Sequence, residues 1–272
     1  MKQFRCGRVV FSDDRPLIMG ILNVTPDSFS DGGDYFAPDA AIKRAHELKA
    51  QGADIIDIGA VSTRPGAKPV SSAEELERIR PVLSGLKDSG LALSVDTTDW
   101  RVALFAAENG ACMINDVSGY YNSYISSVIK GFHLGWIITH TDNVDAGSTV
   151  QRMSTVSEEV LAYFDASLEK AVSMGIPEDQ ICVDPGFGFA KTTAENSELL
   201  GNFAWFAEFP CFAMCALSRK RFLGELTNEP DPVKRDFASV IAGTAAVVCG
   251  ANIIRTHNVK MAKTMLDVLY PL

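Results

Sequence analysis

The chain has few of the features that mark secreted, membrane-bound or nucleic-acid-binding proteins. Its 272 residues include six cysteines and four histidines, and no two cysteines form the Cys-x-x-Cys pair typical of zinc or redox sites. The formal net charge of −9 argues against binding to nucleic acid or an anionic membrane, because either would need clustered Lys and Arg. These absences favour a cytoplasmic protein with reduced thiols, whose partners are small molecules.

Long hydrophobic segments are also scarce. The basic amino terminus is followed by only three apolar residues, Val9–Phe11, which is too short for a signal peptide. Residues 237–254 carry no charge and are long enough to resemble a membrane span. Ser239, Gly243 and Gly250 interrupt this stretch, so we expect a covering helix, a turn and a buried strand instead of a span.

Short apolar runs alternate with segments of helical spacing along the chain. The runs, which we interpret as strands, are residues 17–22, 55–58, 91–95, 113–114, 136–139, 181–183, 211–215 and 252–254. Helical spacing is found at residues 40–51, 73–87, 98–108, 157–174 and 235–248. Eight strand-and-helix repeats predict a single α/β domain over residues 1–272, folded as a (β/α)8 TIM barrel.

Polar residues stand at or just beyond the ends of the predicted strands. They are Asn23, Asp57, Asp96, Asn115, Asp184, Ser218, Lys220, Arg255 and His257. In barrels of this class the chemistry lies at the carboxyl ends of the strands, so we expect these side chains to surround one mouth. Capping of the following helix explains any single one equally well, but the whole set favours a site.

Seven motifs contain these residues and follow one another in a fixed order. They are residues 20–33, Asp57–Gly59 with Ser62–Gly66, Val95–Thr97, Ile114–Gly119, Asp184–Phe189, Ser218–Lys220 and Arg255–His257. Together they resemble the motifs of the dihydropteroate synthases, which belong to the pterin-binding enzyme family. The resemblance covers nearly the whole chain and implies a TIM barrel with its active site at the carboxyl ends of the strands.

The resemblance implies a transferase of folate biosynthesis. Such an enzyme joins para-aminobenzoate to 6-hydroxymethyl-7,8-dihydropterin pyrophosphate and releases 7,8-dihydropteroate and pyrophosphate. It implies that Asp96, Asn115, Asp184 and Lys220 bind the polar edge of the pterin ring. Burying that edge costs a few kcal/mol unless each group is paired, so the same set also selects against other bicyclic rings.

The leaving group is expected to bind at the first and last strands. By resemblance, Asn23, Arg255 and His257 hold the pyrophosphate, and Asn23 is the protein ligand of a Mg²⁺ ion. Together with Asp96 and Lys220, these three are the expected catalytic residues. The nucleophile is an aniline nitrogen, neutral near pH 7, and therefore needs no strong general base.

Two connections, residues 25–38 and 59–71, are long for loops between a strand and a helix, which marks them as candidate lids. The resemblance implies that they fold over the site. It also places Thr63, Arg64, Pro65 and Ser218 around the para-aminobenzoate ring, and it implies a homodimer formed through outer helices.

The chain departs from the usual family pattern at several positions. Val61 stands where Glu is usual, Ala190 and Ala216 stand where Gly is common, and Asn258 replaces an Asp. Residues 138–143 are also more polar than in many relatives. None of these changes removes a residue assigned to the pterin edge or to the pyrophosphate.

Two other functions remain open at this stage. One is a pterin-binding paralogue with weak or no turnover, which the changes at Val61 and Asn258 favour. The other is a corrinoid-linked pterin methyltransferase, which needs the Asp and Asn set but not Ser218, Lys220, Arg255 and His257 around a pyrophosphate.

Overall fold

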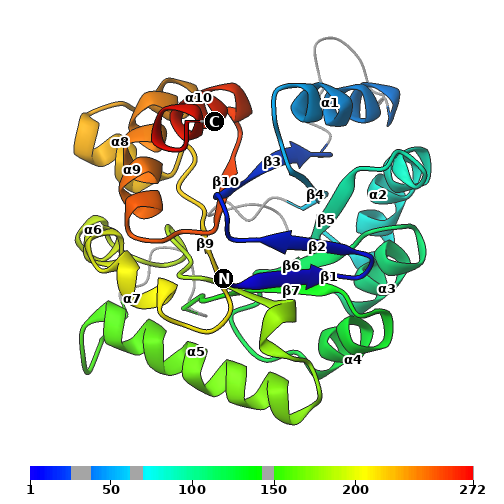
Figure 1. The fold of residues 1–272 in the computed structure, drawn as a ribbon, viewed down its shortest axis with the longest axis horizontal. Coiled ribbons are helices and arrows are strands. Elements are labelled where there is room, and N and C mark those ends of the chain that lie inside the picture. The colour runs from blue at the N-terminus through cyan, green and yellow to red at the C-terminus, as the bar shows by residue number, and fades with distance from the viewer. Residues whose placement is uncertain (26–37, 62–69, 143–149, 272) are drawn as a thin grey trace.

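Eight parallel strands close into a barrel, as the alternation of the sequence predicts. The structure is a computed structural model that describes residues 1–25, 38–61, 70–142 and 150–271. The barrel strands are β3 (Leu17–Asn23), β4 (Ile55–Gly59), β5 (Ala92–Asp96), β6 (Met113–Asp116), β7 (Gly135–Thr139), β8 (Ile181–Asp184), β9 (Phe212–Cys215) and β10 (Ile253–Thr256). They follow the order β10-β3-β4-β5-β6-β7-β8-β9, so neighbours in sequence are neighbours in space (Figure 1).

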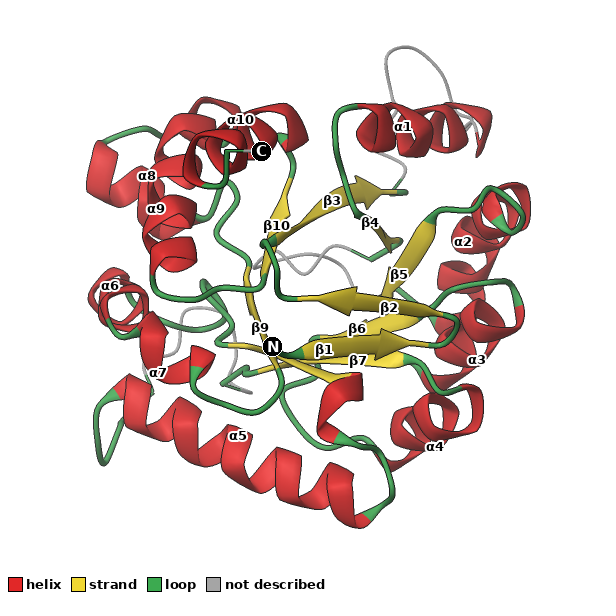
Figure 2. Ribbon diagram, in the orientation of Figure 1, coloured by secondary structure: helices red, strands yellow, loops and turns green. Residues whose placement is uncertain are grey.

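Helices surround the barrel (Figure 2). They are α1 (Pro38–Ala50), α2 (Ser72–Leu86), α3 (Trp100–Glu108), α4 (Ser123–Phe132), α5 (Val156–Ser173), α6 (Thr193–Gly201), α7 (Phe203–Ala207), α8 (Arg221–Thr227), α9 (Asp236–Val248) and α10 (Val259–Leu269), with short 3₁₀ turns η2 (Glu178–Gln180) and η3 (Val233–Arg235). Local signals fix several ends. Ser71 caps α2 by accepting from the Glu74 N–H, and Gly52 after α1 takes a φ of 107° that favours glycine.

The uncharged stretch 237–254 is not a membrane span. It forms most of α9, a turn at Gly250 and the start of β10, which confirms the prediction. Within the described parts of the chain, no helix has both the length and the apolar character needed to cross a membrane.

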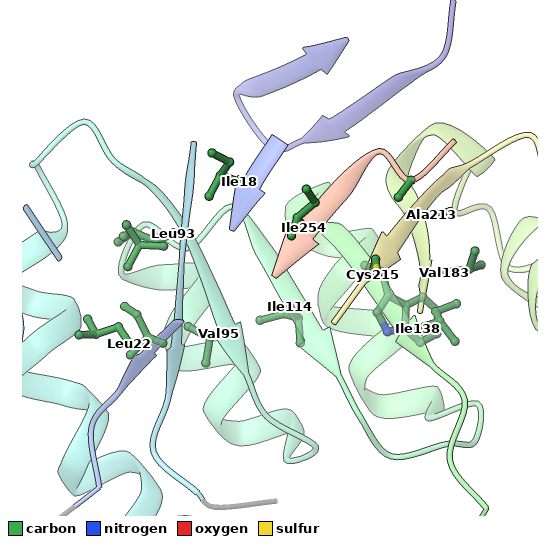
Figure 3. Packing of buried hydrophobic residues seen from close by; sticks show 14 of the residues in the cluster. Ile18, Leu22, Leu93, Val95, Ile114, Ile138, Val183, Ala213, Cys215 and Ile254 are labelled. Carbon is green, nitrogen blue, oxygen red and sulfur yellow. The ribbon is translucent and has the colours of Figure 1, made fainter. Parts of the chain in front are cut away.

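Side chains alternate between the two faces of every barrel strand. Residues that point outward, such as Ile18, Leu93, Ile114, Ile138 and Ile254, are buried in one large cluster (Figure 3). The helices complete that cluster with residues such as Leu48, Val82 and Phe164. The outward face of the barrel is therefore largely apolar, and it supplies most of the core.

A second cluster fills the barrel interior near the amino ends of the strands. Its strand residues are Leu17, Met19, Ile55, Met113, Ile137, Cys182, Phe212, Met214 and Ile253. These inward positions are occupied by large apolar side chains, so this half of the barrel is packed solid. The five buried cysteines and the half-buried Cys249 are all free thiols, as expected from the sequence.

An antiparallel hairpin, which the sequence analysis does not predict, closes the amino-terminal end of the barrel. It consists of β1 (Gln3–Cys6) and β2 (Val9–Ser12), and Figure 1 shows it lying across the barrel. Phe4 and Cys6 are fully buried and belong to the interior cluster, where the Phe4 and Phe212 ring centroids lie 5.5 Å apart. Burial of one such aromatic ring contributes roughly 1.5–3 kcal/mol, so the hairpin acts as a plug.

Candidate active site

The inward positions become polar toward the carboxyl ends of the strands. Each polar residue stands two positions after an inward-pointing residue that is closer to the amino end of the same strand. Two residues is the repeat of side-chain direction along a strand. The pairs are Ile55 and Asp57, Ser94 and Asp96, Met113 and Asn115, Cys182 and Asp184, and Ile253 and Arg255. Five different strands therefore point polar side chains into one mouth, as predicted.

Arg255 of β10 is held by two carboxylates, one from β4 and one from β5. Its Nε donates to Asp57 Oδ2 over 2.6 Å and its Nη2 donates to Asp96 Oδ2 over 2.8 Å. Asn115 also donates to Asp57 Oδ2, over 3.2 Å. Asp57 is fully buried. It bridges Asn115, which is expected on the pterin edge, and Arg255, which is expected on the pyrophosphate. The sequence predicts that Asp57 lies at a strand end, but it does not predict this bridging role.

Asp96 has an unusual environment for a carboxylate. Burial, opposed by the charges of Arg255 and Lys220 and assisted by those of Asp57 and Glu75, raises the pKa of Asp96 to about 7. Its charge is therefore poised close to neutral pH, where a small change in the site changes its protonation. A group with this property suits a step in which positive charge develops nearby.

Asp184 and Lys220 are fixed by the connection between β8 and α6. Asp184 Oδ1 accepts from the Gly186 N–H over 3.0 Å, and burial raises the pKa of Asp184 above its ordinary value. Lys220 Nζ lies 4.5 Å above the ring of Phe189, a cation–π contact. Burial lowers the pKa of Lys220 to about 8, against the attraction of Asp184.

His257 and Ser218 face each other at the ends of β10 and β9. The Ser218 Oγ lies 2.9 Å from His257 Nδ1 and accepts from the His257 backbone N–H over 3.1 Å. The structure thus brings a residue expected on the pyrophosphate next to one expected on the aminobenzoate. Arg219, which lies between Ser218 and Lys220 in the sequence, instead pairs with Asp236 at 2.6 Å and acts in the scaffold.

Asn23 is the last residue of β3, which pairs with β4. A Cβ built on Gly59 would lie 3.8 Å from Asn23 Oδ1 and 3.9 Å from Asp96 Oδ2, so both oxygens flank the same glycine. Thr63, Arg64 and Pro65, expected in the aminobenzoate pocket, lie outside the described residues, as do 26–37 of the first candidate lid. Ser218 is the one member of that predicted pocket whose position is described.

Several buried polar atoms in the same region have no hydrogen-bond partner among the described residues. They are Asp57 Oδ1, Ser94 Oγ, Asn115 Oδ1 and Thr139 Oγ1. Such atoms are rare in folded proteins because each costs free energy unless water or a ligand satisfies it. A polar ligand in the mouth would repay part of that cost. Ser94 and Thr139 were missed in the sequence, although the period of two places both on the inward face.

Comparison with known proteins agrees with this geometry. The family model for pterin binding enzymes matches residues 19–257. This chain belongs to the pterin-binding enzyme family.

Individual relatives narrow the comparison within the family. Dihydropteroate synthase of Staphylococcus haemolyticus is 40% identical over 246 residues, which cover 90% of each chain. The mitochondrial folate synthesis bifunctional protein of Pisum sativum is also 40% identical over 265 residues, and the match covers 90% of this chain but only 51% of that protein. The crystal structure of Burkholderia cenocepacia dihydropteroate synthase complexed with 7,8-dihydropteroate has a TM-score of 0.89 and 34% identity, and covers 98% of this chain and 95% of that one.

The structure explains one departure from the family pattern, Asn258, and shows the surroundings of two others. Asn258 caps α10 by accepting from the Met261 N–H, and it donates to Asp236 over 2.9 Å. Ala190 takes a φ of 50°, the left-handed conformation that favours the glycine common in the family. Ala216 is buried in the barrel interior, and nothing in the structure explains Val61.

Proposed function

We propose that the chain is a dihydropteroate synthase, a transferase that condenses 6-hydroxymethyl-7,8-dihydropterin pyrophosphate with para-aminobenzoate. The observation that carries the proposal is the convergence of Asp96, Asn115, Asp184 and Lys220 on one mouth, beside buried polar atoms that have no partner within the described parts of the chain. Similarity to dihydropteroate synthases, one of them complexed with the reaction product, supports the same activity.

The pterin edge would bind to groups of matching polarity. The carboxylate of Asp184 accepts from the ring N–H and the exocyclic amino group, and the Lys220 ammonium donates to a ring acceptor. The Asn115 amide, whose oxygen has no partner among the described residues, completes the set. A ring without the amino group would donate one hydrogen bond fewer to the buried Asp184 carboxylate, and the site would select against it.

The chemical step breaks the bond between the exocyclic methylene carbon and the pyrophosphate oxygen. The aniline nitrogen of para-aminobenzoate supplies the electron pair for the new carbon–nitrogen bond and then loses a proton. Arg255 and His257 stabilise the negative charge that accumulates on the leaving pyrophosphate. Asp96, when ionised, favours the positive charge that develops on the methylene carbon.

A Mg²⁺ ion fits the donor set near Asn23. The described residues contain no group of three His, Cys, Asp or Glu side chains that could hold a metal. Mg²⁺ bound to a phosphate ester needs only one or two protein oxygens, however, and the Asn23 amide oxygen beside Asp96 meets that need. When bound, the ion would neutralise charge on the pyrophosphate.

Pyrophosphate release, measured with and without para-aminobenzoate and Mg²⁺, tests the proposal. Release that depends on aminobenzoate supports the synthase. Tight pterin binding without release would favour the paralogue. Methyl transfer to a corrinoid would favour the methyltransferase.

We further propose that residues 1–272 act as one domain in the cytoplasm and that the chain forms a homodimer. A cytoplasmic location fits the free thiols. Phe237, Ile241 and Val248 are 69%, 56% and 73% exposed and lie along one face of α9, which offers an apolar surface to a second copy. Sedimentation of Ile241→Asp tests this surface, and a wild-type protein that is monomeric at micromolar concentration would contradict the homodimer.

A further inference from the structure

Lys191, a residue with no assigned role, lies buried behind the active site. It follows the Asp184–Phe189 motif, and its side chain is fully buried. Lysine is almost never buried without partners, because removing an ammonium from water costs several kcal/mol. Its surroundings therefore have to explain its position.

The Lys191 ammonium is surrounded by backbone oxygens from two barrel connections. Nζ donates to Gly186 O over 3.1 Å, to Phe189 O over 3.3 Å and to His140 O over 3.4 Å. His140 follows β7, whereas Gly186 and Phe189 belong to the connection after β8. One cation thus ties the two connections together.

An ion network supplies the opposite charge. The Asp142 carboxylate lies 4.0 Å from Lys191 Nζ and accepts two hydrogen bonds from Arg152. Arg152 also pairs with Glu159 of α5 at 2.6 Å and with Glu195 of α6. Asp142 lies in the segment 138–143, which is more polar than in many relatives.

The connection that Lys191 holds has a strained backbone. Gly186 has a φ of 72°, and a Cβ there would collide with the His140 carbonyl oxygen. Ala190 has a φ of 50°, which a residue with a side chain adopts only at a cost in conformational energy. Such a conformation persists only where the surroundings over-determine it. The bonds from Lys191 to Gly186 O and Phe189 O span this turn and supply that constraint.

The same connection touches both Asp184 and Lys220. The Gly186 N–H binds the Asp184 carboxylate, the Phe189 ring lies under the Lys220 ammonium, and a Cβ on Gly188 would lie 3.0 Å from Lys220 Cδ. A shift of this connection would therefore displace two of the four groups expected on the pterin edge.

We propose that Lys191 is a positioning residue for pterin recognition: its ammonium holds the Gly186–Ala190 turn, with its left-handed alanine, so that Asp184 and Lys220 face the ring. The inference rests on the proposed pterin-binding function. It predicts that the glycine common in the family at position 190 would make the turn less dependent on Lys191.

Binding of 6-hydroxymethylpterin, measured by calorimetry, tests this with four proteins: wild type, Lys191→Met, Ala190→Gly and the double variant. We expect Lys191→Met to raise the Kd for the pterin at least tenfold, and Ala190→Gly to recover at least threefold of that loss in the double variant. Ala190→Gly alone should change the Kd less than twofold. Lys130→Met, at an exposed position on α4, is the matched control and should bind as wild type does.

Specific outcomes would overturn the proposal. An unchanged Kd in Lys191→Met would show that Lys191 does not position the pterin site. An equal loss of affinity in Lys191→Met and in the double variant would show that Lys191 does not act through the turn at Ala190. If Lys191→Met does not fold, Lys191→Gln retains two N–H donors without the charge, and its Kd should lie between that of wild type and a full loss of binding. A wild type that binds no pterin would instead refute the proposed function itself.

Discussion

The two halves of the barrel interior are built from the same strands but have opposite chemistry. Near the amino ends, inward residues such as Ile55, Met113 and Cys182 pack into one apolar cluster under the β1–β2 hairpin. Two positions further along the same strands, Asp57, Asn115 and Asp184 are also buried. Asp57 pairs with Arg255, Asp184 accepts from the Gly186 N–H, and the Asn115 amide oxygen has no partner among the described residues. The lower half stabilises the fold, whereas the buried polar groups of the upper half reduce stability and provide an environment for a polar ligand.

The largest effect is expected in the lower half, on stability. Phe4→Ala would empty a fully buried position in the plug, and such changes cost about 3–5 kcal/mol. Chemical denaturation should show the loss, while the affinity of the folded fraction for pterin stays unchanged. Val10→Ala, on the exposed side of the same hairpin, should cost less than about 0.5 kcal/mol. A similar loss in both variants would refute the plug.

The converse is expected in the upper half, where Asp184→Asn should reduce binding more than stability. Removing the charge weakens the bonds to the pterin edge, and we expect affinity to fall at least about 100-fold, or about 2.7 kcal/mol. Titration with 6-hydroxymethylpterin measures this, and Lys220→Ala should behave in the same way. Asp179→Asn is a matched control, because Asp179 pairs with the exposed Arg5 near the opposite end of the barrel. Unchanged affinity in Asp184→Asn would mean that the pterin site lies elsewhere.

Asp57→Asn and Asp54→Asn compare an acidic position within β4 with one just before its amino end. Arg255 would lose one of its two carboxylate partners, and we expect kcat/KM to fall about 30-fold, or about 2 kcal/mol. Asp54→Asn, three residues earlier on the lower side, breaks a half-exposed pair with Arg15 and should leave kcat/KM within about twofold. Equal effects in steady-state kinetics would show that Asp57 acts through general stability.

The pH dependence of kcat/KM should be a narrow bell. The pKa of Asp96, near 7, gives the acid limb, because its protonated form no longer favours positive charge on the substrate. The pKa of Lys220, near 8, gives the alkaline limb, because the neutral amine cannot serve as the ammonium donor. Each limb should fall tenfold per pH unit at most. In Asp96→Asn the acid limb should disappear, and its persistence near pH 7 would assign it to another group.

The raised pKa of Asp96 also makes the stability of the fold depend on pH, in the direction opposite to activity. Because folding raises the pKa of Asp96 above its ordinary 3.8, the native state holds this proton more tightly than the unfolded chain does. The contribution of Asp96 to stability is therefore complete below about pH 3.8 and is lost as the pH rises through about 7. Activity through Asp96 thus rises over a range in which its contribution to stability falls.

Much of this contrast could be predicted from the sequence, because it follows from local patterns. Apolar runs identified all eight barrel strands within a few residues, and polar strand ends such as Asn115 and Asp184 identified the mouth. The pairing of Arg255 with Asp57 could not be predicted, since the two residues are 198 positions apart and meet only when the barrel closes. Short helices such as α8 and the β1–β2 hairpin were missed because their segments are too short to show a clear period.

Other features depend on backbone geometry that sequence alone does not reveal. The left-handed Ala190 and the buried Lys191 have no signature in composition or spacing, since an exposed lysine would give the same pattern. Likewise, the residues 62–66 motif predicts an aminobenzoate pocket through Thr63, Arg64 and Pro65, and this remains a prediction.

The most direct test of the central claim is a pyrophosphate-release assay on the purified protein with 6-hydroxymethyl-7,8-dihydropterin pyrophosphate and Mg²⁺. If the polar upper half is the active site of a dihydropteroate synthase, release will require para-aminobenzoate, 7,8-dihydropteroate will form in equal amount, and Asp184→Asn will abolish both. Release at the same rate without para-aminobenzoate, or no release from a protein that binds the pterin tightly, would contradict the account.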